Sequence, residues 1–90
     1  MAFGVTVADR ISFGNMKCVI LNVNDVQNDG SSTHKMGWNR VIAVKAVNNT
    51  DSSDTFKEAV GAQTVASHKD EVTFTSVTND DDGLAWVWGY

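Results

Sequence analysis

The feature that most constrains the fold of this chain is the regular alternation between short apolar segments and clusters of turn-forming residues. The segments are rich in Val, Ile, Thr, Phe and Trp. The clusters contain Gly, Asn, Asp and Ser and lie at 14–15, 24–37, 48–54, 67–70 and 79–83. Because the chain has no proline, these clusters supply all of its turns. The pattern predicts an all-β domain, a sandwich or barrel of about six short antiparallel strands with room for one short helix.

Two segments, 17–23 and 40–47, are apolar at both odd and even positions. A strand with one face in solvent alternates between apolar and polar residues, whereas a strand covered on both faces does not. We therefore expect these two strands to be central. The segment 71–77 does alternate, with Val72 and Phe74 on its apolar face, which predicts a strand with one solvated face.

Two regions leave alternatives open. In the segment 54–66, Asp54 could cap a short helix, but Gly61 interrupts the helical stretch, and a strand or irregular strand is the favoured alternative. The loop 24–37 is longer than most loops in compact domains, and such loops are often contact surfaces or mobile. Its residues 28–30 could form a hairpin turn, because Asn and Gly tolerate positive φ.

The totals bound what the protein can do. Ninety residues predict a single domain, 1–90, with a modest core. Cys18 is the only cysteine, so no disulfide can form within the chain. The net charge of −4 argues against direct contact with nucleic acid, whose phosphates need Lys and Arg. No apolar run approaches the length of a membrane span, and the N-terminus lacks a signal-peptide pattern, so we expect no membrane contact and no secretion by the standard pathway.

No pattern for catalysis or metal binding stands out. His34 and His68 lie in polar loops, and Cys18 lies within an apolar segment, which predicts a buried small side chain rather than a nucleophile. When the run 80–83 is aligned with a calcium-binding EF-hand loop, the first and last ligand positions are not filled. We expect this run to be a solvated turn that ends in Gly83. The sequence thus predicts no catalytic residues, no metal site, no cofactor and no enzymatic activity.

The chain ends on a segment with one strongly aromatic face. Alternation places Leu84, Trp86, Trp88 and Tyr90 on one side and Ala85, Val87 and Gly89 on the other. Bulky rings bury about 150–250 Å² each, so the favoured interpretation is that at least one Trp closes the core. The alternative is that part of this face meets another subunit, because Trp and Tyr are frequent interface anchors. Stacking on a sugar or single-stranded DNA would need polar or basic neighbours that the segment lacks.

A second interface candidate is the exit of the long polar loop. Lys35 and Met36 precede Trp38 there, and the indole would meet a partner together with the C-terminal aromatic face. The candidate interface residues are therefore Trp38, Met36, Lys35, Trp86, Trp88 and Tyr90.

The two ends of the chain share a further pattern. The chain opens with a Val/Thr strand, a turn at Phe13-Gly14-Asn15 and a strongly apolar strand at 16–23. It closes with a turn at Asp82-Gly83 and a Trp-containing strand at 84–90. In this combination it resembles small virion proteins of tailed bacteriophages. The resemblance covers both ends and not the middle, and Met16 stands where such proteins often have a basic residue.

The resemblance implies a non-enzymatic structural role in a phage particle, most simply as a capsid decoration or cement protein that binds over capsomer junctions and stabilises the head. It implies as partners the major capsid protein and further copies of the chain, as a dimer or trimer. The location would be the capsid surface of the virion, after assembly in the host cytoplasm. The alternatives are a tail, neck or fibre-associated virion component, or a small carbohydrate- or peptide-binding β module.

Overall fold

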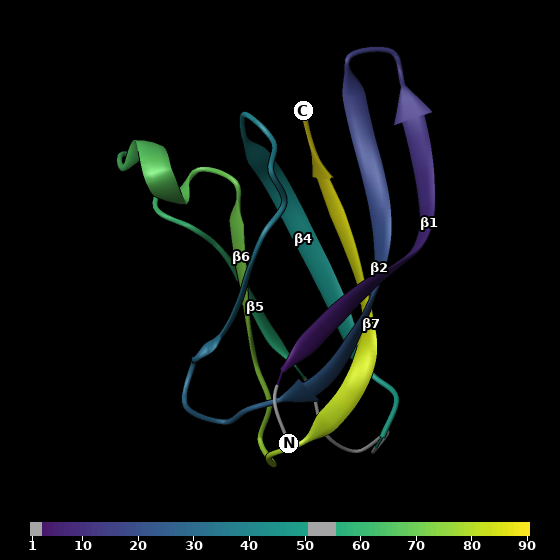
Figure 1. Ribbon diagram of the computed structural model, residues 1–90, viewed down its shortest axis with the longest axis vertical. Coiled ribbons are helices and arrows are strands. Elements are labelled where there is room, and N and C mark those ends of the chain that lie inside the picture. The colour runs from purple at the N-terminus through teal and green to yellow at the C-terminus, as the bar shows by residue number, and fades with distance from the viewer. Residues whose placement is uncertain (1–2, 51–55) are drawn as a thin grey trace.

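Two antiparallel sheets face each other in the computed structural model, which describes residues 3–50 and 56–90 (Figure 1). The four-stranded sheet has the order β1 (Gly4–Phe13), β2 (Met16–Val26), β7 (Asp81–Gly89), β4 (Val41–Asn48). The three-stranded sheet has the order β3 (Ser32–Lys35), β6 (Glu71–Thr75), β5 (Lys57–Val60). The prediction of an all-β sandwich is confirmed, with seven strands in the described residues, and the fold is not a closed barrel.

The core lies between the two sheets. Ala85 and Val87 of β7 are fully buried, and the register places Ala85 beside Leu21 of β2. From the opposite sheet, Val72 and Phe74 of β6 are fully buried as well, so the predicted alternation of that strand is confirmed. These side chains belong to one cluster of buried residues that joins both sheets. Since such contiguous apolar burial is the main stabilising term in folding, this cluster is what positions every surface described below.

β4 is an edge strand, so the prediction that it is central is wrong. Among the described residues it pairs only with β7, whereas β2 pairs with both β1 and β7 and is central as expected. Val41 of β4 is buried, but Ile42 is 48% exposed and Val47 is 40% exposed. The apolar residues of β4 therefore divide between the core and the surface, and the sequence pattern of such a strand is the same as that of a strand covered on both faces.

Both regions that the sequence left open are settled where the structure describes them. The strand alternative for 54–66 is confirmed at β5, and the only helical element of the described residues is the 3-10 turn η1 (Ala66–His68); the start of that segment, 54–55, lies outside the described residues. The predicted hairpin at 28–30 is wrong, because β3 pairs with β6 and not with β2. The segment after β2 instead crosses from one sheet to the other, with Gly30 at a φ of 78°.

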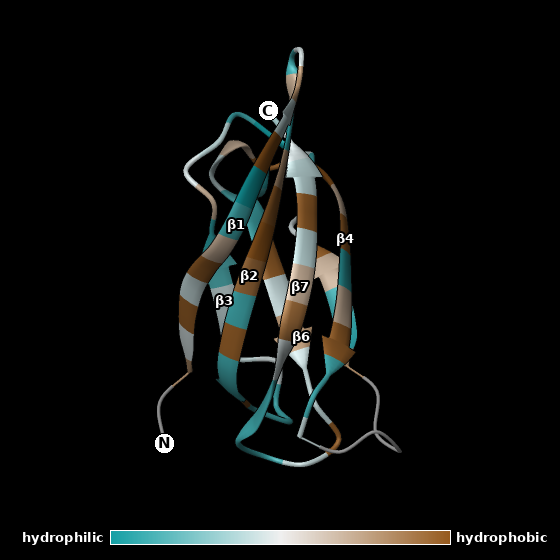
Figure 2. Cartoon of the chain, turned by 90° about the vertical axis from the view of Figure 1, so that its right-hand side faces the viewer, coloured by the Kyte–Doolittle hydropathy of each residue, from teal (hydrophilic) through white to brown (hydrophobic). Residues whose placement is uncertain are grey.

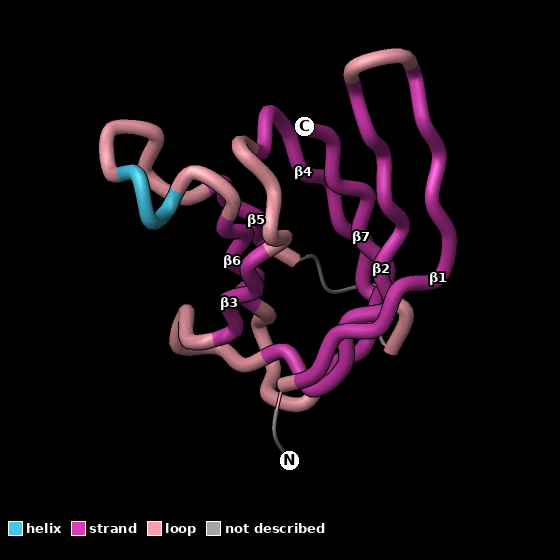
Figure 3. The backbone as a smooth tube through the Cα atoms, turned by 45° about the horizontal axis from the view of Figure 1, so that its top comes forward, coloured by secondary structure: helices cyan, strands magenta, loops and turns pink. Residues whose placement is uncertain are grey.

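The sandwich is closed on one side and open on the other. β4 of one sheet lies next to β5 of the other, whereas β1 and β3 are edge strands that each have a single partner in the described part of the chain (Figures 1 and 3). The β1–β2 hairpin turns at Gly14, where φ is 61°, and its side chains are exposed from Thr6 to Phe13. The first residues of β1 still contribute to the core, since Val5 packs against the buried cluster. The later part of the hairpin projects beyond the core and leaves an opening toward β3.

Candidate docking surfaces

The outer face of the four-stranded sheet carries the C-terminal tryptophans. The strand register defines it by three rows of neighbouring side chains: Ile11–Cys18–Trp88–Ala43, Asp9–Ile20–Trp86–Lys45 and Thr6–Asn22–Leu84–Val47. Figure 2 looks onto this side of the molecule, where β1, β2, β7 and β4 lie side by side. Ile11 is 42% exposed, and Trp86 and Trp88 are half-buried. This is a largely apolar surface that the described part of the chain does not cover.

The interpretation that Trp86 or Trp88 closes the core is therefore wrong. β7 is a core strand as expected, but its small face points inward, and rings from other segments fill the space over its glycines. A Cβ atom on Gly83 would lie 2.3 Å from Cε2 of Phe56, and one on Gly89 would lie 2.9 Å from Cε3 of Trp38. Close approach of rings to backbone requires the absence of a side chain there. The inward side chains of β7 are small because the rings of Phe56 and Trp38, which pack over them, are large.

Cys18 lies on the outer face and is nevertheless only 4% exposed. The register places it between Ile11 of β1 and Trp88 of β7, which flank the thiol from both sides. Burial raises the pKa of the Cys18 thiol, so the reactive thiolate is disfavoured. The prediction of a buried small side chain at this position is confirmed.

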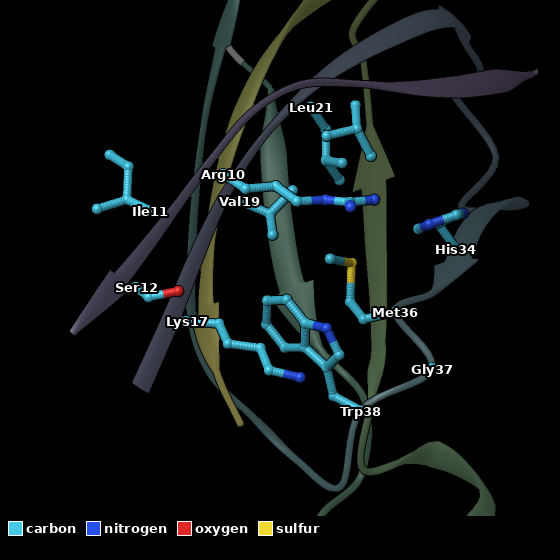
Figure 4. A pocket seen from close by; sticks show the side chains of 11 residues that line it. Arg10, Ile11, Ser12, Lys17, Val19, Leu21, His34, Met36, Gly37 and Trp38 are labelled. Carbon is cyan, nitrogen blue, oxygen red and sulfur yellow. The ribbon is translucent and has the colours of Figure 1, made fainter. Parts of the chain in front are cut away.

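A second surface is the cavity of about 480 Å³ that lies between the β1–β2 hairpin and the segment following β3 (Figure 4). Its apolar lining includes Val19 and Leu21 from β2 together with Met36 and Trp38. In Figure 4 the side chains of Met36 and Trp38 extend from one wall, facing the hairpin on the other. We call this cavity the hairpin groove. It brings together two of the predicted interface residues.

The hairpin groove is basic. Arg10, Lys17 and His34 line it, and no carboxylate of the described residues does. The Lys17 ammonium lies 5.7 Å from the centroid of the Trp38 ring, a cation–π distance. Burial lowers the pKa of His34, and the Asp70 carboxylate opposes this effect only in part, so the imidazole is neutral near pH 7. The permanent charges of the groove are thus Arg10 and Lys17, in a chain whose net charge is −4.

Asp70 positions the wall of the groove that carries Met36 and Trp38. It is 8% exposed, its Oδ2 accepts a hydrogen bond of 2.8 Å from the Gly37 amide, and its backbone oxygen accepts one of 2.9 Å from the Met36 amide. Gly37 has a φ of 73°, which lets the chain turn around this carboxylate. The role of Asp70 could not be found from the sequence, because it depends on a contact between residues far apart in the chain.

The predicted interface residues therefore separate into distinct places. Met36 and Trp38 line the hairpin groove, whereas Trp86 and Trp88 lie on the outer face. Lys35 is directed toward η1, where its Nζ donates a hydrogen bond of 2.6 Å to the Ser67 carbonyl, so it belongs to neither surface. Tyr90 is 42% exposed at the end of the chain.

Sequence reasoning missed Arg10 and Lys17. Both point from the hairpin toward the same side, since Arg10 pairs with Val19 and Lys17 precedes Val19 by two residues. Alternation on either side of the Phe13-Gly14-Asn15 turn contains this information, so the turn was the signal that could have found them.

The acidic run at 80–82, where β7 begins, has a structural role. Asp81 is 4% exposed, and its Oδ2 accepts hydrogen bonds of 2.7 Å from the Ser76 hydroxyl and 2.8 Å from the side-chain amide of Asn48. The turn ends at Asp80, whose φ is 64°, and β7 begins at Asp81, so the predicted solvated turn ending in Gly83 is wrong in its boundary and in the burial of Asp81. A hydrogen bond from Gln27 lowers the pKa of Asp80. Within 3–50 and 56–90, no group of His, Cys, Asp and Glu could hold a metal ion.

Comparisons with known proteins give no relative for this chain: no family model matches it, and no curated protein or solved structure matches it. No helix among the described residues is long and apolar enough to cross a membrane. The outer face and the hairpin groove are therefore the basis for proposing what the protein does.

Proposed function

We propose that the chain is a non-enzymatic structural protein of a phage particle, a decoration or cement protein that binds over capsomer junctions and stabilises the head. The class of particle comes from the resemblance of the two chain ends to small virion proteins. The structure supports an attachment role through its outer face, because apolar surface that a small protein leaves uncovered is typical of an interaction site. The partner on this face is the major capsid protein, and further copies of the chain complete the assembly as a dimer or trimer.

The observation that carries the proposal is the position of Trp86 and Trp88 on the outer face. Both rings are half-buried within the chain, so each is held in place and still has area to lose against a partner. Rigid aromatic anchors of this kind dominate the energy of many interfaces. Asp9 and Lys45, which share the row of Trp86, bring opposite charges to the two edges of the face and favour one orientation of docking.

A binding assay with heads of the phage that encodes the chain tests this proposal. We expect the wild-type protein to sediment with the heads and Trp86→Ala to bind about tenfold more weakly, because the anchor is lost. Val47→Lys, at a 40% exposed position of the same face, should weaken binding without removing a half-buried ring. Val77→Ala is the matched control, since Val77 is 66% exposed and lies outside the rows of the outer face.

A cooperative thermal transition in each variant shows that the fold is intact. Binding of both outer-face variants at the wild-type level would contradict the proposal. Imaging of labelled protein on whole particles distinguishes a position on the capsid from one on the tail, neck or fibres.

A further inference from the structure

The hairpin groove lies beside an unpaired sheet edge. Within 3–50 and 56–90, β1 is hydrogen-bonded only to β2, so among these residues no strand pairs with the backbone amides and carbonyls of its other edge. Such edges bind extended chains by adding a strand to the sheet. A strand added beside β1 would continue the rows of the sheet, and its inward side chains would lie next to Arg10 and Ser12, over the groove. Its outward side chains would continue the outer face.

The charges of the groove select the chemistry of such a strand. Among the described residues the Arg10 guanidinium has no hydrogen-bond or ion-pair partner, and Lys17 faces the Trp38 ring rather than a carboxylate. In Figure 4 both side chains extend from the hairpin toward the wall formed by Met36 and Trp38. Two cations without a counter-charge beside an apolar floor are complementary to a segment that carries both carboxylates and apolar side chains.

We propose that the hairpin groove binds an extended acidic segment of a partner protein, which adds a strand to the free edge of β1. Its carboxylates pair with Arg10 and Lys17, and an apolar side chain between them rests on Met36 and Trp38. The cavity of about 480 Å³ has room for such a side chain without rearrangement of the core. Asp70, through its hydrogen bonds to Met36 and Gly37, keeps the far wall in place before the segment arrives.

This site is independent of the proposed attachment surface. The hairpin groove lies on the inner side of the four-stranded sheet, and the tryptophans of the outer face lie on the other side. A substitution at Trp86 therefore tests the attachment to heads and leaves the groove residues unchanged. Substitutions at Arg10 and Lys17 test the groove, so failure of one proposal can be told from failure of the other.

The test uses the full chain labelled with ¹⁵N and two short blocked peptides, one alternating valine with aspartate and the other alternating valine with lysine. We expect the aspartate peptide to shift the amide signals of β1 and the indole N–H signal of Trp38, and to bind at least about tenfold more tightly than the lysine peptide. Arg10→Gln and Lys17→Gln should each weaken binding of the aspartate peptide severalfold. Both residues are exposed, so neither change should impair folding.

Lys45→Gln is the matched control, because it makes the same change in charge on the opposite side of the sheet. If it weakens binding as much as Lys17→Gln does, the attraction is only that of net charge, and the proposed site is wrong. Equal binding of the two peptides, or shifts confined to residues outside β1 and Trp38, would also overturn it. Shifts of the β1 amides that depend on protein concentration without peptide would assign the groove to a second copy of the chain instead.

Discussion

The two faces of β7 differ in the size and burial of their side chains, and they have different roles. The inward face has Gly83, Ala85, Val87 and Gly89, all buried, and the outward face has Leu84, Trp86 and Trp88, all half-buried. The smaller side chains are the ones that the fold depends on, because the rings of Phe56 and Trp38 approach the backbone of β7 where a side chain would collide with them. Size alone therefore does not identify a core residue. A core residue is identified by how well its side chain packs against the side chains that face it, as expected for close-packed interiors.

Removal of residues 84–90, which include most of β7, should have the largest effect on the fold. β7 pairs with both β2 and β4, so a chain truncated before Leu84 loses the hydrogen-bonding partner of both strands together with Ala85 and Val87 of the core. We expect the truncated chain to show no cooperative thermal transition by circular dichroism. Tyr90→Ala is the control, since it alters only an exposed side chain and keeps the backbone hydrogen bonds of Tyr90 to Arg40. A cooperative transition in the truncated chain would show that the two faces of β7 are both dispensable for folding.

A single methyl group on the inward face should have the next largest effect. In Gly83→Ala the added Cβ would lie 2.1 Å from the Val47 carbonyl oxygen and 2.3 Å from Cε2 of Phe56, so backbone or ring must move. We expect a loss of about 3 kcal/mol in the free energy of unfolding, measured in urea. Gly4→Ala is the matched control, because a Cβ at Gly4 has no atom within 4 Å and this substitution should be nearly neutral. Equal stability of the two variants would contradict the packing of Phe56 on β7.

The sequence predicted where the strands lie better than it predicted which of their faces is buried. Alternation shows which residues of a strand share a face, and this was sufficient for Val72 and Phe74 of β6. It does not show which face points inward, and in β7 both faces were apolar enough to be the core. The orientation was decided by Phe56 and Trp38, which are far away in the sequence. The sequence pattern of β4 predicts a central strand for a related reason, since an apolar outer surface and a second core face give the same pattern.

The hairpin groove was predictable only in part. Arg10 and Lys17 can be placed on one side of the sheet from the turn at Gly14 alone. The opposite wall consists of Met36 and Trp38, whose position depends on Asp70, a residue in the turn before β6. No local pattern contains that contact. The residue type alone therefore marks Trp38 as a candidate. It does not mark Arg10 and Lys17, the cations that line the groove beside it.

Inward and outward side chains also differ in burial at the first two residues of β7. Asp81 points inward and is 4% exposed, whereas its neighbour Asp82 is exposed and accepts a hydrogen bond from the Asp25 amide. In Asp81→Ala the Ser76 hydroxyl and the side-chain amide of Asn48 lose the buried carboxylate that accepts from both, which should lower the free energy of unfolding by about 2–3 kcal/mol. Asp82→Ala should cost about 1 kcal/mol or less. A reversed order in urea unfolding would show that the inward side chain is not the structural one.

A small effect on stability is expected even where the largest side chain is removed. Trp86→Ala deletes a whole indole, yet the ring lies on the outer face and keeps part of its surface in water, so the free energy of unfolding should fall by only about 1 kcal/mol. The same variant should lose most of its attachment to heads, which Gly83→Ala, if it folds at low temperature, should retain. Urea unfolding compared with head binding for these two variants therefore separates folding from docking on one strand. A loss of 3 kcal/mol or more for Trp86→Ala would mean that the indole stabilises the chain itself, as a core residue does, and would return the C-terminal aromatic residues to the fold.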